Sequence, residues 1–247
     1  MTLSERFVEV LGVPFINTTK DQFVARLGEH LNKEDKTFVV TANPEIVLHA
    51  YEDKTYREYL DRATYITADG IGVVKAAGML GHPLPERVTG FDTFMDLLAL
   101  ANEKSYSIYL LGAKDEVLQK TIAEINRQFP NVVIAGSHHG FFDWSETTIE
   151  DEIKEKKPDM VFLALGFPRQ EKWIAERMDQ FDKGLFMGIG GSFDVLAGEV
   201  QRAPEFWQKV HLEWFYRLVK QPSRWKRMLA LPIFAGKVLR EKRRAKK

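Results

Sequence analysis

The feature that most constrains the fold is a series of short, wholly apolar runs that alternate with helical patterns. The run from Val161 to Leu165 is apolar at every position, so both faces of such a strand must be buried. Strands of this kind lie in a sheet that helices cover on both sides, and short strand–helix links favour parallel pairing. We therefore expect an α/β fold with a Rossmann-like, mostly parallel sheet flanked by helices.

This pattern predicts six strands and six helices. The strands are 37–41, 64–67, 107–111, 132–135, 160–165 and 185–189. The helices are 44–60, 71–80, 90–103, 115–128, 146–156 and 168–180. A small hairpin is expected over residues 8–16, ahead of the sheet.

Charge divides the chain into two unequal parts. Residues 209–247 contain 13 Lys or Arg against two Glu, a net charge of +11, so residues 1–208 carry −11 in a chain of zero net charge. Aromatic side chains, including Trp207, Trp214 and Trp225, run through the basic part. Basic and aromatic residues together suit an anionic membrane surface. Helices packed on the core and a nucleic-acid-binding tail are the alternatives; we favour the membrane.

The same division predicts the organisation of the chain. We expect an α/β core over residues 1–195 and a basic, aromatic-rich helical appendage over 196–247. No secretory signal and no apolar stretch long enough to span a bilayer is visible, so we expect a cytoplasmic protein, peripheral on the inner face of the membrane. The absence of cysteine excludes disulfides and thiolate sites, and the six histidines have no metal-ligand spacing.

Ligands of parallel sheets bind beyond the carboxyl ends of the strands. Thr41 and Asn43 follow the first predicted strand, and Asn43 can either cap the next helix or join Thr41 in lining the crevice. Asp69 follows the second strand, where it is either a helix cap or a general base. Gly70 and Gly72 allow close approach of a nucleotide or sugar to the backbone.

Three further segments reach the same edge. Arg87 is either a surface ion-pair partner or a phosphate ligand. Gln170 and Glu171 open a helix, and Glu171 suits the helix dipole whether or not it binds a substrate. Gly190 and Gly191 follow the last strand, where they permit either contact with a ligand or tight packing. We include Arg87, with Asp69, among the candidate catalytic residues. The other four residues are candidate substrate-binding residues.

No Asp-x-Asp motif of the kind that carries a metal in nucleotide-sugar enzymes is present, and there is no Walker loop. A reaction without metal would need arginines and helix N-termini to stabilise a departing diphosphate. We therefore expect neither a metal nor a cofactor.

Seven motifs together resemble one family. They are Thr41-Ala-Asn-Pro-Glu, Ala68-Asp-Gly-Ile-Gly, Arg87-Val-Thr-Gly-Phe-Asp, Gly166-Phe-Pro-Arg-Gln-Glu, Gly190-Gly-Ser-Phe-Asp-Val-Leu-Ala-Gly, Arg202-Ala-Pro and Glu213-Trp-Phe-Tyr-Arg-Leu. In this order, over roughly residues 8–240, the sequence resembles the WecG/TagA/CpsF glycosyltransferases. It is most similar to the branch that builds the linkage unit of wall teichoic acid.

The resemblance implies transfer of N-acetylmannosamine from its UDP sugar to N-acetylglucosaminyl-diphospho-undecaprenol. It further implies a β-1,4 linkage formed with inversion and without metal. Asp69 matches the family's proposed base, Arg87 an arginine for the leaving diphosphate, and Gln170 a sugar or nucleotide contact; Thr41 and Asn43 match crevice residues.

Further arginines match the family's membrane appendage, which is thought to fold over the active site. They are Arg217, Arg224 and Arg227, expected at the acceptor diphosphate and the membrane. The expected partners are a UDP-sugar donor, a polyprenyl-diphosphate acceptor and an anionic membrane surface, but no nucleic acid. Whether the chain forms a homo-oligomer is left open.

Two other functions stay open at this point. The first is transfer of a different sugar, such as N-acetylmannosaminuronate or a hexose, to a polyprenyl diphosphate. The second is a nucleotide-binding membrane adaptor without chemistry, against which Asp69 beside two glycines argues. A nicotinamide-dependent oxidoreductase is disfavoured, because the sequence lacks the Gly-x-Gly-x-x-Gly turn.

Overall fold

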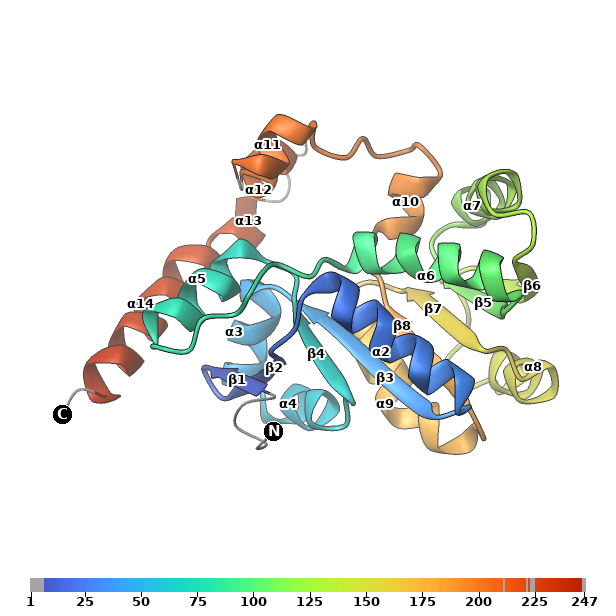
Figure 1. Ribbon diagram of the computed structural model, residues 1–247, viewed down its shortest axis with the longest axis horizontal. Helices are drawn as coiled ribbons and strands as arrows, with labels where there is room; N and C mark the ends of the chain where they lie inside the picture. The colour runs from blue at the N-terminus through green and yellow to red at the C-terminus, as the bar shows by residue number, and fades with distance from the viewer. Residues whose placement is uncertain (1–6, 211, 221, 223–224, 246–247) are drawn as a thin grey trace.

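The centre of the computed structural model is a six-stranded parallel sheet with the order β4-β3-β8-β7-β5-β6 (Figure 1). The structure describes residues 7–210, 212–220, 222 and 225–245. The strands are β3 (Lys36–Ala42), β4 (Tyr65–Ala68), β5 (Ser107–Gly112), β6 (Val133–His138), β7 (Met160–Ala164) and β8 (Gly184–Gly188). The six predicted strands and their parallel pairing are thereby confirmed.

The predicted hairpin is also present. It consists of β1 (Phe7–Val10) and β2 (Val13–Ile16), which pair antiparallel. Leu11 and Gly12 form the two-residue turn with φ of 50° and 82°. Positive φ at both turn residues matches the right-handed twist of the two strands.

Ten helical segments surround the sheet within the described residues of the core. They are α2 (Lys20–Asn32), α3 (Pro44–Glu52), α4 (Lys54–Asp61), α5 (Ile71–Met79), α6 (Gly90–Lys104), α7 (Asp115–Gln128), α8 (Thr148–Lys156), α9 (Arg169–Arg177), the 3-10 turn η1 (Met178–Gln180) and α10 (Ser192–Leu196). The single helix expected over 44–60 is instead two. Asp53 ends α3 and caps α4, where its Oδ1 accepts from the N–H of Tyr56 at 3.1 Å.

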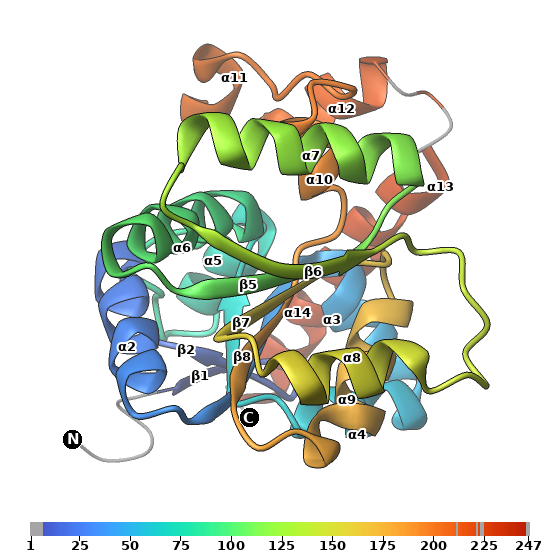
Figure 2. The ribbon, with the colours of Figure 1, turned by 90° about the vertical axis from the view of Figure 1, so that its right-hand side faces the viewer.

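Two hydrophobic layers lie on opposite faces of the sheet. Along β3, Phe38 and Val40 belong to one layer and Val39 to the other, because successive side chains of a strand point to opposite faces. Helices α2, α6 and α7 cover one face, whereas α4, α8 and α9 cover the other (Figure 2). The strands are therefore buried on both sides, as their apolar sequences predict.

The C-terminal segment is helical, as expected. It comprises α11 (Glu205–Lys209), α12 (Glu213–Lys220), α13 (Trp225–Met228) and α14 (Ala230–Ala245). Helix α14 packs along α3 and α5, and it buries Phe234 and Val238 in the main hydrophobic cluster (Figure 1). No helix of the described residues combines the length and apolarity needed to cross a bilayer. The boundary between residues 195 and 196, and membrane association, stay predictions.

Candidate active site

The carboxyl ends of β3 and β4 are joined by backbone hydrogen bonds that continue beyond the strands. The N–H of Asp69 donates to the carbonyl of Ala42 at 3.1 Å, and the N–H of Val88 donates to the carbonyl of Ala68 at 3.0 Å. Arg87 directly precedes Val88 in the chain. The structure therefore brings Asp69 and Arg87 to the same edge of the sheet.

Thr41 lies at this edge beneath the start of α6. Its hydroxyl donates to the carbonyl of Gly188 at 3.4 Å, which connects the ends of β3 and β8. A Cβ at Gly90, the first residue of α6, would come within 2.9 Å of the Thr41 Oγ1 atom. Thr41 is thus largely buried, and its position depends on a glycine at residue 90.

The cap interpretations give different results for Asn43 and Asp69. The Oδ1 of Asn43 accepts from the N–H groups of Glu45 at 2.9 Å and Ile46 at 3.1 Å, so Asn43 caps α3. The N-cap residue of α5 is Gly70, without a side-chain hydrogen bond, and not Asp69. Asn43 is therefore a helix cap, whereas Asp69 is not the N-cap residue of α5, and its role as a general base stays a prediction.

Gly70 and Gly72 lie against Pro44 at the start of α3. A Cβ on Gly70 would be 2.7 Å from the Cδ atom of Pro44, and one on Gly72 would be 2.8 Å from its Cγ atom. Both distances are too short for ordinary packing. Close contact between two helix starts accounts for these glycines, and their contact with a substrate stays a prediction.

Arg87 is paired with the appendage. Its Nη1 atom lies 3.2 Å from the Oε2 atom of Glu213, the first residue of α12, and both side chains are mostly buried. The ion-pair alternative is therefore correct in kind, although the pair is not a surface one. Its role toward a diphosphate stays a prediction.

A second ion pair joins the appendage to the same edge. The guanidinium of Arg202 contacts both carboxylate oxygens of Asp92, at 2.7 and 2.9 Å, and lies 4.9 Å from the ring centre of Phe91. Although burial opposes ionisation, hydrogen bonds from Arg202 and Thr89 lower the pKa of Asp92. This ion pair therefore attaches the start of the appendage to helix α6.

Gln170 connects the loops that follow β7 and β8. Its Oε1 accepts from the N–H of Gly190 at 3.0 Å, and its Nε2 donates to Glu171 Oε1 at 2.8 Å. The side chain of Gln170 also lies close to Gly188, where an added Cβ atom would come within 2.5 Å of the Nε2 atom of Gln170. Glu171 is buried behind it, with 1% of its surface exposed.

Gly190 and Gly191 form the turn between β8 and α10. Gly190 has a φ of +54°, a conformation that favours glycine, and no atom lies within 4 Å of where its Cβ would be. The space beside this turn is therefore open. The positive φ explains the glycine at residue 190 better than tight packing does, and contact with a ligand stays a prediction.

A cavity of about 440 Å³ lies at the same edge, between the ends of β5 and β7. From these neighbouring strands the chain continues into α7 on one face and α9 on the other, which makes a topological switch point (Figure 2). The lining residues are Ala113, Lys114, Glu116, Val117, Gly140, Phe141, Ala164, Leu165, Arg169, Asp194 and Glu199.

The polar and aromatic residues of this cavity are not among the predicted site residues. Arg169 and Asp194 lie within motifs that were noted for their neighbours, and Phe141 follows a glycine after β6. Phe141 is 68% exposed. The one available signal was the position of these residues beyond strand ends.

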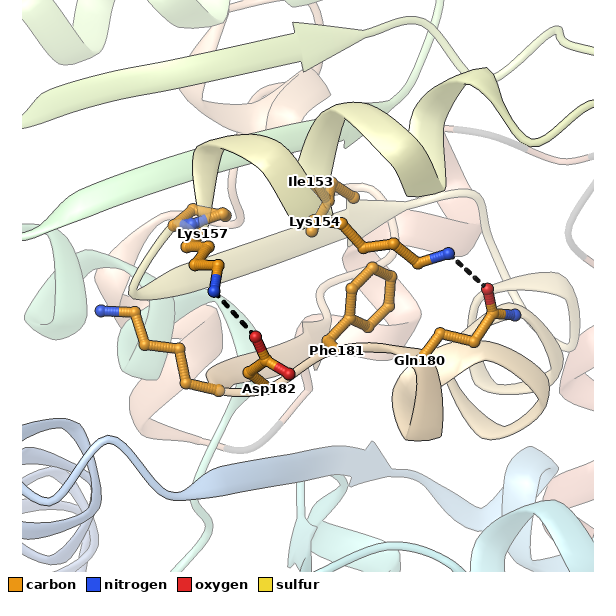
Figure 3. A pocket seen from close by; sticks show the side chains of 8 residues that line it. Ile153, Lys154, Lys157, Gln180, Phe181 and Asp182 are labelled. Atoms are coloured by element: carbon orange, nitrogen blue, oxygen red, sulfur yellow. Dashed lines mark hydrogen bonds and ion pairs between the residues drawn. The ribbon is translucent and has the colours of Figure 1, made fainter.

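A smaller hollow lies at the opposite edge of the sheet, before β7 and β8. It measures about 20 Å³ and is bordered by Ile153 and Phe181 (Figure 3). Lys157 donates to Asp182 at 2.8 Å across it, and Lys154 donates to the Oε1 atom of Gln180 at 2.9 Å. This volume holds no more than about one water molecule, so the hollow is not a substrate site.

The structure gives different amounts of information on the three appendage arginines. Arg227 is paired with Glu45, in the first turn of α3, with 2.7 Å between Nη2 and Oε2. Arg217 belongs to α12, and Arg224 lies outside the described residues. Within the described part of the chain, no group of three His, Asp or Glu side chains is placed to hold a metal ion.

The family of this protein follows from its similarity to known proteins. A model of the glycosyl transferase WecG/TagA/CpsF family matches residues 8–247. The chain belongs to this family.

Full-length relatives agree with that assignment. The chain is 40% identical over 235 residues to an N-acetylglucosaminyldiphosphoundecaprenol N-acetyl-beta-D-mannosaminyltransferase of Bacillus subtilis strain 168, covering 95% of this chain and 91% of the relative. A protein of the same name from Staphylococcus aureus strain MW2 is 39% identical over 253 residues, covering 100% of this chain and 99% of the relative. The resemblance inferred from the seven motifs is confirmed.

Proposed function

We propose that this glycosyltransferase moves N-acetylmannosamine from its UDP sugar to the 4-hydroxyl of N-acetylglucosaminyl-diphospho-undecaprenol, forming a β-1,4 linkage with inversion and without metal. This is the step that makes the linkage unit of wall teichoic acid. The names of the full-length relatives support the donor sugar and the acceptor.

One observation carries the proposal within the structure. Asp69 and Arg87 lie at the same edge of the sheet as a cavity of about 440 Å³ at a topological switch point. A base, a cation and a cavity of nucleotide size are the three parts that a sugar transfer from a nucleoside diphosphate requires.

The proposed reaction is a single displacement. Asp69 accepts the proton of the acceptor's 4-hydroxyl while that oxygen forms a bond to the anomeric carbon of the donor. The bond from this carbon to the diphosphate breaks on the opposite face, which inverts the configuration. Arg87 stabilises the charge that develops on the departing UDP.

The cavity between β5 and β7 suits the nucleotide of the donor. Phe141 offers an exposed ring at its edge for stacking on the base. Lys114 and Arg169 bring positive charge toward the phosphates, and the carboxylate of Asp194 can accept from ribose hydroxyls. Gly190 and Gly191 lie next to Asp194, so their open turn can contact the sugar.

The appendage supplies the surface for a membrane. Large apolar side chains are exposed along α12, α13 and the start of α14, including Trp214, Phe215, Trp225 and Ile233. Basic residues follow them in sequence, which suits anionic headgroups. We therefore place the protein peripherally on the inner face of the cell membrane, where its lipid-linked acceptor resides.

We expect the purified protein to transfer sugar from UDP-N-acetylmannosamine, and not from UDP-N-acetylglucosamine or UDP-N-acetylmannosaminuronate. The acceptor is a short-chain lipid analogue of N-acetylglucosaminyl diphosphate, and the product is measured by mass spectrometry. Preference for another UDP sugar would change the assigned donor. UDP binding without transfer from any donor would leave only the adaptor function.

A second arm of this experiment tests metal independence. Turnover is expected to be equal with and without EDTA, because arginines and backbone N–H groups take the place of a cation at the diphosphate. Loss of turnover in EDTA that Mn²⁺ or Mg²⁺ restores would contradict this part of the proposal alone.

Arg87→Ala is expected to lower kcat/KM by on the order of 10²-fold, because removing one donor that stabilises transition-state charge has effects of this size. The measurement is steady-state transfer at several donor concentrations. An unchanged rate and an unchanged donor KM would limit Arg87 to its pair with Glu213.

Two matched variants separate the chemistry from the docking of the appendage. Glu213→Gln weakens the same ion pair while keeping the Arg87 guanidinium. Arg202→Ala removes another ion pair between the appendage and the core, its pair with Asp92. Both are expected to retain more activity than Arg87→Ala. If either variant loses as much activity as Arg87→Ala does, the loss in Arg87→Ala comes from displacement of the appendage.

A further inference from the structure

Glu171 is a buried carboxylate that has no cation beside it. It belongs to the first turn of α9, and within the described residues it forms no ion pair. Its Oε2 atom is buried without a hydrogen-bond partner in that part of the chain. Burial raises the pKa of this carboxyl group to about 7. Burying such a group without a cation to pair with costs stability, so its presence calls for a functional reason.

Among the described residues, the one side-chain hydrogen-bond partner of Glu171 is Gln170. The Nε2 atom of Gln170 donates to Glu171 Oε1 at 2.8 Å, and both atoms are buried. An ionised carboxylate accepts hydrogen bonds but cannot donate them, whereas the two ends of an amide differ. The ionised form of Glu171, which predominates above its pKa of about 7, therefore requires that the NH₂ end of Gln170 face it.

This orientation decides what the other end of Gln170 does. With Nε2 toward Glu171, Oε1 faces Gly190 and accepts from its N–H at 3.0 Å. If the amide turned over, its NH₂ group would meet the N–H of Gly190, leaving two donors opposed and one acceptor lost. The turn at Gly190 would then lose its connection to α9.

The Gly190–Gly191 turn, which Gln170 connects to α9, belongs to the candidate site. Gln170 packs on Gly188, whose carbonyl accepts from Thr41, so one side chain touches the structure that joins β3, β7 and β8. On the other side of the turn, Asp194 lines the cavity. A change in the Gln170 amide would thus move backbone groups that border the donor.

We propose that Glu171 is a positioning residue, which holds the Gln170 amide in the orientation that anchors the Gly190–Gly191 turn beside the donor cavity. It does so without touching the substrate, unlike the direct contact that the sequence analysis expects. This inference rests on the proposed function only for its effect on rate, because the orientation of Gln170 is a property of the protein itself.

The first test is a double-mutant cycle. Glu171→Gln keeps the size of the side chain but can present a donor to Gln170. We expect it to lower kcat/KM about tenfold, the size expected for a hydrogen bond to a charged group. In a Gln170→Ala background the same change is expected to have no further effect. An equal loss in both backgrounds would overturn the proposal.

A matched control separates positioning from stability. Glu150 is likewise a buried carboxylate in the first turn of a helix, α8, but it is paired with Arg177. Glu150→Gln is expected to lower the Tm and to keep kcat/KM. Glu171→Gln is expected to keep or raise the Tm while kcat/KM falls, since it removes an unpaired charge. Parallel losses of Tm and rate in Glu171→Gln would indicate a structural role only.

A second readout does not depend on activity. The side-chain amide resonances of Gln170 are assigned in a ¹⁵N-labelled protein by their absence in Gln170→Ala. They are expected to shift in Glu171→Gln and to stay in place in Glu150→Gln. Unchanged resonances in Glu171→Gln would overturn the positioning role, even in a protein with no transferase activity. If the resonances shift and the donor panel yields no product, only the proposed function fails.

Discussion

Asp69→Asn is expected to lower turnover by about 10²–10⁴-fold, the contribution typical of a positioned general base. The amide cannot accept the proton of the acceptor hydroxyl, whereas its shape differs little from that of the carboxylate. The backbone of Asp69 is held by a hydrogen bond to Ala42, which does not involve the side chain, so the fold should survive. The measurement is kcat at saturating donor, together with the Tm of both proteins.

A capping aspartate serves as the matched control. The carboxylate of Asp53 caps α4 away from the candidate site, and asparagine caps helices as well as aspartate does. Asp53→Asn should therefore retain both rate and Tm. Near-wild-type turnover in Asp69→Asn would mean that Asp69 has no part in proton transfer and that another group is the base.

Replacing the six basic residues of 240–247 by glutamine is expected to weaken binding to anionic vesicles by about four orders of magnitude. Each basic residue near an anionic leaflet contributes about 1 kcal/mol. The affected residues of α14 follow Phe234 and Val238, which attach this helix to the core, so its packing should persist. Co-sedimentation with vesicles of defined phosphatidylglycerol content gives the partition coefficient.

The same variant distinguishes membrane binding from catalysis. Transfer to a water-soluble acceptor should be unaffected, because Arg217, Arg224 and Arg227 remain. High salt should weaken vesicle binding of the unmodified protein by screening these charges. Full-length protein that stays in the supernatant with anionic vesicles at low salt would rule out the membrane surface that we propose.

The strands were predictable because a parallel sheet needs apolar residues on both faces, as in β7. Helix α2 was missed, although Phe23, Leu27 and Leu31 recur every four residues as in an amphipathic helix. The break between α3 and α4 was missed because the apolar pattern continues across Asp53, whose capping role depends on local geometry. Strand order could not be predicted either, as equally apolar strands fit many orders.

The features of the candidate site, too, could be predicted from the sequence only in part. Thr41, Asp69 and Gln170 were predicted to lie at one edge because parallel strands end there together. The pair of Arg87 with Glu213 joins segments far apart in the chain, and no local pattern reports it. The burial of Glu171 likewise depends on how α9 packs, whereas its place in the sequence shows only a helix start.

The position of β8 has a consequence for the newly made chain. Lys36 of β3 pairs with Gly184 of β8, so the middle of the sheet is completed by its last strand. Until residues 184–188 have been synthesised, β3 and β7 each expose an unpaired edge that invites association with other chains. The turn at Gly190 and the contact of Gln170 with it also form only then. A chain interrupted before β8 would have Asp69 and Arg87 but would lack Gly190 and Asp194 beside the donor cavity, so catalytic competence should appear late in synthesis.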